Sequence, residues 1–279
     1  MPPFFVPMKQ KITSPHNERL KELRKLHDRK HRDRSGQFFA EGEDMLTEAL
    51  RHSVYPQALF YDAGALHEDD GLLAAVPNEV DCFPTEREAL DRAGSLGSGS
   101  RVVGIWRQSW SKLESLEGAA VAIYLHDVAD PGNVGATIRS ALALLKSVVV
   151  LSPRSADPFG PKAVRASMGA IFGQPVARAS FEQARTTLSR HRAIALSPRA
   201  GKMLGELELG SPSLFCLGSE RHGLPEEIML ASDRVAHVPQ LSGSVSSLNV
   251  AMTATICLYE SAVHRLSSVS SPSRTRPPE

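Results

Sequence analysis

The sequence contains few of the residues and patterns that mark secreted, metal-binding or membrane-spanning proteins. Its 279 residues include only three cysteines, which are far apart: Cys82, Cys216 and Cys257. No Cys-x-x-Cys pair or Cys/His spacing suggests zinc, so neither a zinc site nor a disulfide framework is expected. No apolar run approaches the ~20 residues that cross a bilayer. These absences predict a cytoplasmic protein with reduced thiols and no metal.

Targeting and nucleotide-binding motifs are also missing. The start, Met1–Pro7, has three prolines and no charged segment followed by an apolar stretch, so no secretory signal is expected. The Gly/Ser-rich stretch 94–100 lacks the Lys-Ser/Thr of a P-loop, and no Gly-x-Gly-x-x-Gly follows a strand. A flexible loop is the expected structure of 94–100, with phosphate binding as the minor alternative.

Positive charge is concentrated near the N-terminus. Residues 9–34 contain ten Lys/Arg and four Asp/Glu, although the whole chain has a net charge of only +1. A basic segment on an otherwise mildly acidic protein suits a polyanion such as nucleic acid. The alternative is a solvated helix face, and charge alone leaves the two interpretations at about even odds.

The N-terminal part of the chain predicts a small α/β domain. Residues 14–34 suit one helix, with Ser14 as its cap and an apolar stripe formed by leucines. Further helices are expected over 42–51 and 86–93, and short strands over 58–61, 79–83 and 101–105. We expect a disordered lead over 1–8, this domain over 9–106 and a polar linker over 107–118.

Beyond the linker, apolar strands alternate with helices. The strands are expected over 121–128, 148–151, 193–196, 214–217 and 235–238. The helices are expected over 133–146, 161–168, 181–190, 225–231 and 248–265. This alternation predicts an α/β fold with a mainly parallel sheet. The second domain is expected to span 119–266, followed by a disordered Ser/Pro-rich tail over 267–279.

The least ordinary segments follow the predicted strands. They are 127–135, 197–198, 218–224 and 239–249, and a helix carrying Arg139 follows the first of them. In an open α/β sheet, ligands bind outside the carboxyl ends of the strands, so these loops are expected to line one crevice.

Each residue in these loops also has a purely structural interpretation. Gly132 and Gly135 can serve a tight turn, and Arg139 can be a surface residue. Asn133, Glu220 and Asn249 can each cap a helix. Only their combination points to a functional site.

Taken together, the loops resemble the three signatures of the SpoU/TrmH family of RNA methyltransferases. Asn133-x-Gly135-x-x-x-Arg139 resembles the first signature, and Leu217–Leu224 the second. The third is matched by Val238-Pro239, by Ser244–Val250 and by Tyr259-Glu260, and Asp157–Ala170 is similar to the helix between the first two. The resemblance covers about residues 120–265. The N-terminal part resembles, less closely, the L30e-like substrate-binding domain often fused to this family.

The resemblance implies a deep trefoil knot in the C-terminal half and a homodimer formed through the knotted domains. It also implies S-adenosylmethionine as cofactor, held largely by backbone groups of the knot loops. The implied cofactor-binding residues are Ser197, Leu217, Gly218, Val238, Ser247 and Leu248.

The implied reaction is methyl transfer to a ribose 2'-hydroxyl, without a metal. The implied catalytic residues are Asn133, Arg139, Glu220 and Asn249. The two asparagines suit orientation of the ribose and of the first loop, and Glu220 suits holding Arg139 or that loop. The family's proposed base is Arg139, but a guanidinium rarely gives up its proton, which favours gripping a phosphate and stabilising the developing alkoxide.

The expected substrate is structured RNA, namely 23S rRNA, with tRNA as the alternative. The expected RNA-binding residues on the basic segment are Lys21, Arg24, Lys25, Arg29, Lys30 and Arg32. Two other interpretations compete: a non-catalytic RNA-binding protein on the same fold, and a nicotinamide- or nucleotide-dependent enzyme on an ordinary doubly wound fold. The intact signature residues count against the first, and the missing glycine fingerprint against the second.

Overall fold

A computed structural model describes residues 10–67, 71–96, 99–145, 147–198, 200–210, 212–241 and 246–269. The predicted lead, 1–8, lies outside the described residues, as does most of the predicted tail. The chain forms two compact units: Met1–Ser109 with Asp157–Gly173, and Trp110–Ala156 with Gln174–Glu279. The first unit thus ends close to the predicted boundary at residue 106. It also includes 157–173, which the sequence placed within 119–266.

The first unit is built on a four-stranded sheet in the order β1-β4-β2-β3. Its strands are β1 (Gln37–Glu41), β2 (Ala58–Asp62), β3 (Asp81–Thr85) and β4 (Val102–Arg107). Its helices are α1 (Glu18–Lys25), α2 (Arg29–Ser35), α3 (Glu43–Arg51), α4 (Gly71–Ala74), α5 (Arg87–Asp91), α7 (Pro161–Ser167) and the short η2 (Ala170–Phe172). β4 pairs antiparallel with β1 and β2, whereas β2 and β3 are parallel.

The predicted single helix over 14–34 is wrong, because the chain breaks into α1 and α2. Asn17, not Ser14, caps α1 by accepting a hydrogen bond from the Arg19 amide. Asp28 caps α2 by accepting from the Lys30 amide. Two capping side chains within one basic stretch favour two short helices over one continuous helix.

Two apolar clusters stabilise this unit. On one face of the sheet, leucines of α1 pack with Phe39, Phe60 and Phe83. A second cluster joins Phe38 and Trp106 of the sheet to Phe159 and Phe172, which come from 157–173. Large rings bury much apolar area, which explains why this later segment belongs to the first unit.

The second unit is built on a seven-stranded sheet in the order β7-β6-β5-β10-β8-β11-β9, with every pair parallel. Its strands are β5 (Val121–Leu125), β6 (Ser147–Leu151), β7 (Val176–Arg178), β8 (Arg192–Leu196), β9 (Lys202–Met203), β10 (Ser213–Leu217) and β11 (Arg234–His237). Its helices are α6 (Pro131–Leu144), α8 (Phe181–Thr187), α9 (Glu226–Leu230) and α10 (Val250–Val269), with the short η1 (Leu113–Leu116) and η3 (Leu204–Glu206). The predicted α/β class with a mainly parallel sheet is confirmed.

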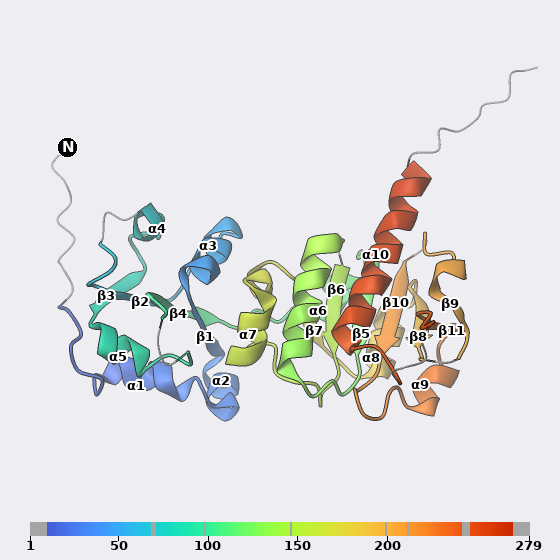
Figure 1. Ribbon diagram of the computed structural model, residues 1–279, viewed down its shortest axis with the longest axis horizontal. Helices are drawn as coiled ribbons and strands as arrows, with labels where there is room; N and C mark the ends of the chain where they lie inside the picture. The colour runs from blue at the N-terminus through green and yellow to red at the C-terminus, as the bar shows by residue number, and fades with distance from the viewer. Residues whose placement is uncertain are drawn as a thin grey trace, which may run out of the picture. The chain divides into compact units, whose positions relative to one another are not determined.

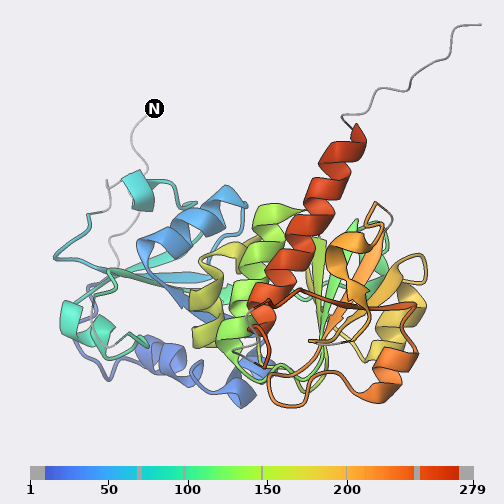
Figure 2. The same ribbon diagram turned by 45° about the vertical axis from the view of Figure 1, so that its right-hand side comes forward.

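Helices cover both faces of this sheet, as its continuous apolar strands require. On one face, alternate residues of the strands pack with η1, α8 and α9. α6 and α10 lie side by side over the other face (Figures 1 and 2), joined by a 2.7 Å hydrogen bond between the Ser140 and Thr255 hydroxyls. α10 continues to Val269, three residues into the predicted tail.

The described helices include none long and apolar enough to cross a membrane. The cysteines of the second unit, Cys216 and Cys257, are buried and free. Burial raises the pKa of the Cys216 thiol to about 12, so this thiol stays protonated at neutral pH.

Candidate active site

A cleft of about 570 Å³ opens at the carboxyl ends of β8, β10 and β11. All six residues predicted to bind the cofactor line it: Ser197, Leu217, Gly218, Val238, Ser247 and Leu248. Glu220 and Asn249 line it as well. Three of the four loops that the sequence assigned to one crevice, 197–198, 218–224 and 239–249, contribute to its lining, whereas 127–135 does not. The cleft is large enough for a cofactor-sized ligand.

The loop between β10 and α9 closes tightly on itself at one wall of the cleft. The Gly223 amide donates to the Ser219 carbonyl at 2.9 Å, and the two residues form an isolated antiparallel bridge. A Cβ on Gly218 would collide with the Gly223 backbone, so this position requires glycine. The close approach brings backbone groups to the cleft and leaves Glu220 at its edge.

Three of the four predicted catalytic residues form one hydrogen-bonded chain. The Asn249 side-chain amide donates to Asn133 Oδ1 at 2.9 Å. The Asn133 side-chain amide in turn donates to Glu220 Oε1 at 2.7 Å. The chain joins three loops, those that follow β5, β10 and β11, and so fixes their relative positions.

The helix-capping interpretation is confirmed for Asn249 and is wrong for Asn133. Asn249 does cap α10, because its Oδ1 accepts from the amides of Ala251 and Met252 at 2.8 and 3.2 Å. Asn133 is not the cap of α6, since Asp130 accepts from the Gly132 amide there. Asn133 lies in the first turn, where its side chain is available for the chain described above.

Arg139 lies outside this chain. Its side chain is exposed on α6, nearly two turns beyond Asn133, and it does not line the cleft. Glu220 was predicted to hold either Arg139 or the first loop. It contacts the loop, because its Oε1 accepts a hydrogen bond from Asn133. Within the described part of the chain, Arg139 has no ion-pair partner, so its guanidinium is available for an external anion.

Two features of the site were not predicted from the sequence. Gln240 lines the cleft, and its buried Oε1 has no hydrogen-bond partner among the described residues. Asp127, two residues after the end of β5, has a left-handed backbone with φ of 53°. No sequence pattern indicates either feature, because both depend on the local loop conformation.

Asp127 is held by three neighbours. Its Oδ1 accepts from the Ser152 hydroxyl at 2.8 Å, and Oδ2 pairs with Arg154 at 2.5 Å. Burial raises the pKa of the Asp127 carboxyl, but Ser152, Arg154 and His126 lower it more, so the net shift is downward. A charged Asp127 therefore anchors the start of the loop that leads to Asn133.

The six predicted RNA-binding residues of the N-terminal segment fall into different environments. Lys21 and Lys25 are paired with Glu18 and Glu22, each at 2.5 Å, and Arg29 with Asp33 at 3.6 Å. These three cations remain about half exposed. Lys30 is exposed on α2. These four residues remain candidates for RNA contact.

The prediction that Arg32 binds RNA is wrong, because this side chain is buried. It is 4% exposed and pairs with Asp157 at 2.7 Å, while also donating to the Leu26 and His27 carbonyls. Arg24 is partly buried and donates to the Pro15 carbonyl at 2.7 Å. Composition could not separate these two from their exposed neighbours.

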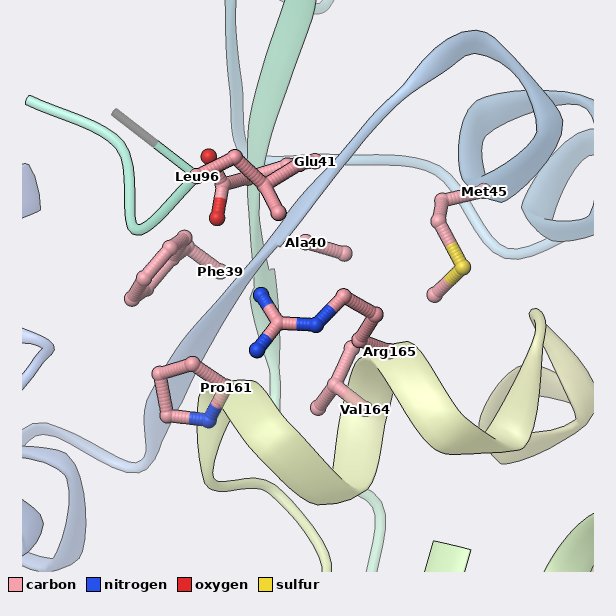
Figure 3. Close-up of a pocket in the computed structure, with 8 residues that line it drawn as sticks. All are labelled: Phe39, Ala40, Glu41, Met45, Leu96, Pro161, Val164 and Arg165. Atoms are coloured by element: carbon pink, nitrogen blue, oxygen red, sulfur yellow. The ribbon is translucent and has the colours of Figure 1, made fainter. Parts of the chain in front are cut away.

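The glycine-rich stretch 94–100 does not present a phosphate-binding loop in its described part. The Ser95 amide donates to both carboxylate oxygens of Glu41 at 3.0 Å. The Glu41 carboxylate therefore already uses the amide that a phosphate would need. Figure 3 shows Arg165 extending from α7 into the adjacent space between Phe39, Glu41 and Leu96. That cavity, of about 20 Å³, has room for about one water. Residues 97 and 98 lie outside the described residues.

A parallel α/β sheet with a polar cleft at its carboxyl edge is the architecture of proteins that bind nucleotides or nucleotide-containing cofactors. Within the described residues, no group of three or more His, Cys, Asp and Glu side chains is arranged to hold a metal ion.

Comparison with known families defines the protein more closely. Residues 120–259 match the SpoU rRNA methylase family, and residues 17–102 match the MRM3-like substrate binding domain. The chain belongs to the SpoU rRNA methylase family, which confirms the resemblance seen in the three signatures. The second match confirms that a substrate-binding domain precedes the methylase domain.

Relatives with a named activity align with nearly the whole chain. The 23S rRNA (guanosine(2553)-2'-O)-methyltransferase RlmP of Bacillus subtilis is 27% identical, covering 90% of this chain and 98% of the relative. The 23S rRNA (uridine(2479)-2'-O)-methyltransferase of Streptomyces viridochromogenes is also 27% identical, covering 94% of each chain. The crystal structure of the AdoMet-bound rRNA methyltransferase from Sinorhizobium meliloti has a TM-score of 0.81 and 29% identity, covering 91% of this chain and 98% of that one.

Proposed function

We propose that this protein transfers a methyl group from S-adenosylmethionine to a ribose 2'-hydroxyl of 23S rRNA. The observation that carries the proposal is the Asn249–Asn133–Glu220 chain at the edge of a cofactor-sized cleft. The two relatives above that act on 23S rRNA support this substrate. A tRNA substrate remains the alternative.

The cleft fits the methyl donor chemically. The unpaired, buried Oε1 of Gln240 is an acceptor, and S-adenosylmethionine offers donors from its adenine amine, ribose hydroxyls and ammonium group. Leu217, Val238 and Leu248 supply apolar contacts, while Ser197, Gly218 and Ser247 supply backbone groups. When bound, the donor provides an electrophilic sulfonium methyl group, which needs no metal for activation.

The residues of this chain then have to position the ribose and stabilise the charge that develops on its oxygen. The Asn133 and Asn249 amides are fixed by each other and by Glu220, so they orient the first loop before the substrate arrives. Arg139 is exposed and positively charged. It is suited to grip the phosphate beside the target nucleotide and to stabilise the forming alkoxide.

The same chemistry requires RNA to be held before methyl transfer. The partly or fully exposed cations Lys21, Lys25, Arg29 and Lys30 of α1 and α2 supply a sequence-independent contact to phosphates. The match of residues 17–102 to a substrate binding domain supports this role.

The protein is further proposed to act in the cytoplasm as a homodimer, with the trefoil knot typical of the family. An exposed apolar stripe on α10 supports dimerisation. Met252, Tyr259, Val263 and Leu266 recur at helical spacing and are 62%, 56%, 37% and 70% exposed. A second copy is the partner that suits this stripe, because a twofold contact pairs the same helix face from both subunits.

The proposal is tested by transfer of labelled methyl groups from S-adenosylmethionine to purified, unmodified rRNA and tRNA pools. Label in the rRNA pool alone is the expected result. Label in tRNA alone would select the alternative substrate. If neither pool is labelled and S-adenosylhomocysteine does not raise the melting temperature, the enzyme proposal is wrong.

A further inference from the structure

A second polar groove lies at the opposite end of the strands of the parallel sheet, where the strands begin. It has a volume of about 480 Å³ and is lined by residues at the amino ends of β8, β10 and β11. The lining includes four arginines, Arg185, Arg190, Arg192 and Arg234, together with His191 and Asp233. The same three strands end at the donor cleft, so groove and cleft are separated by about 16 Å, the length of a five-residue strand.

The charge of this groove is strongly one-sided. Its only carboxylate, Asp233, is already engaged by Arg185 in a two-pronged contact at 2.9 and 3.0 Å. Asp233 also accepts from the Ala193 amide at 2.7 Å. Burial lowers the pKa of His191, so its ring is neutral at physiological pH. Three arginines are left without a neutralising carboxylate in the groove lining.

Those three arginines are placed to bind an external anion. Arg192 donates to the Glu208 carbonyl at 3.2 Å, and Arg234 to the Asp233 carbonyl at 2.7 Å. These contacts hold each guanidinium while leaving most of its five N–H donors free. Arg190 and Arg234 are exposed, and within the described residues Arg190 makes no hydrogen bond or ion pair. Guanidinium groups suit phosphate oxygens because they can donate two parallel hydrogen bonds.

The groove offers no exposed ring on which a base could stack, because its only ring besides Pro212 is that of His191, which is buried. Guanidinium groups can also contact base edges, but phosphate oxygens carry the charge that the three arginines lack in a partner. The positive charge of the groove therefore favours the phosphodiester backbone.

We propose that this arginine groove binds the RNA backbone at a position remote from the methylated nucleotide. The inference rests on the proposed function, because that function supplies RNA as the substrate. The groove acts as a second RNA contact, at the amino ends of the strands whose carboxyl ends form the donor cleft. It raises affinity for a long RNA without taking part in methyl transfer.

The test compares two double variants of the full chain that each lose two positive charges from the second unit. Arg190→Gln/Arg234→Gln removes two groove cations, and Lys112→Gln/Lys202→Gln is the matched control outside the groove. Arg185 and Arg192 are kept, because one binds Asp233 and the other begins β8. Binding of a 23S rRNA transcript is measured over a series of salt concentrations.

The groove variant is expected to bind the transcript roughly 10-fold more weakly, with a salt slope reduced by about 1.5. Its KM for the transcript should rise by a similar factor while kcat stays unchanged. S-adenosylhomocysteine should raise its melting temperature as it does for the unmodified protein, which shows that the fold is intact. The control variant should change affinity by less than about threefold.

Equal affinities and salt slopes for the groove and control variants would overturn the groove proposal while leaving the proposed function untouched. A change of oligomeric state in the groove variant alone would also overturn it, because the groove would then be an interface between copies. If the unmodified protein binds the transcript but methylates no RNA, the proposed function fails and the groove proposal is still decided by the binding comparison.

Discussion

At the scale of single residues, Asn133 occupies the central position of the candidate site. It receives a hydrogen bond from Asn249 and donates one to Glu220. A role in orientation and a role in capping were both open from the sequence. The structure assigns the cap of α6 to Asp130, so the Asn133 side chain is committed to the link between loops.

Replacing Asn133 by alanine should therefore separate the loops without unfolding the chain. We expect methyl transfer to fall about 100-fold, because misplacement of the reacting groups is costly. The stability loss should be only about 1 kcal/mol, the worth of ordinary hydrogen bonds at a partly exposed position. Steady-state kinetics and thermal unfolding measure the two effects.

Ser140→Ala is the matched control, because it also removes a side-chain hydrogen bond from α6 but lies away from the cleft. It should retain nearly full activity. An Asn133→Ala variant as active as this control would show that the hydrogen-bonded chain is not needed for transfer.

Arg32 has a structural role, although it lies in a segment whose composition suggests nucleic-acid binding. Its ion pair with Asp157 is almost completely buried, at 5% and 8% side-chain exposure. Leaving one buried charge without its partner typically costs about 3 to 5 kcal/mol. We expect a loss of this size for Arg32→Leu, measured by denaturant unfolding.

Arg34→Gln provides the comparison, because Arg34 is exposed on the same helix. It should change stability by less than about 0.5 kcal/mol. If Arg32→Leu were as stable as Arg34→Gln, and instead lost RNA affinity, the original sequence interpretation of Arg32 would be right.

At the scale of elements, the apolar strands and the loops after them were predictable from the sequence. The five strands expected in the second unit are present, with ends shifted by at most a few residues, because buried parallel strands are continuous apolar runs. β1 was not predicted as a strand. β7 and β9, of three and two residues, are too short to give a pattern.

The candidate site was predictable to a similar extent. Ser197, Glu220 and Asn249 could be assigned to one cleft because the carboxyl ends of parallel strands meet at one edge. The hydrogen-bond partners within the cleft, the orphaned Gln240 oxygen and the left-handed Asp127 could not. They depend on side-chain rotamers and loop closure, which periodicity does not determine.

The apolar stripe on α10 leads to a prediction about assembly. Tyr259→Glu places a charge in the middle of this stripe, where the proposed dimer would bury it, so the dimer should dissociate into monomers. Sedimentation at micromolar concentration measures the change. Leu230→Glu is the control, since Leu230 is an equally apolar residue, 79% exposed on α9. A Tyr259→Glu variant with the same mass as the control would contradict dimerisation through α10.

At the scale of the whole molecule, the two units carry different parts of the proposed machinery. The first unit carries exposed cations on α1 and α2 and matches a substrate binding domain. The second carries the donor cleft, the asparagine–glutamate chain and the arginine groove. Residues 157–173 belong to the first unit although they lie within the methylase match, so the methylase sequence itself contributes to the substrate-binding unit.

We propose that the whole molecule transfers a methyl group to a ribose oxygen of rRNA, with support from Arg139 and without a metal. The most direct measurement is to label an unmodified 23S rRNA transcript with the protein in the presence of a metal chelator and then hydrolyse it with alkali. A 2'-O-methyl group removes the nucleophile that alkali needs, so we expect the label to remain in an alkali-resistant dinucleotide. Arg139→Ala should give no label, although S-adenosylhomocysteine still raises its melting temperature. Label recovered in single nucleotides would rule out ribose methylation, and undiminished label with Arg139→Ala would rule out the role of Arg139.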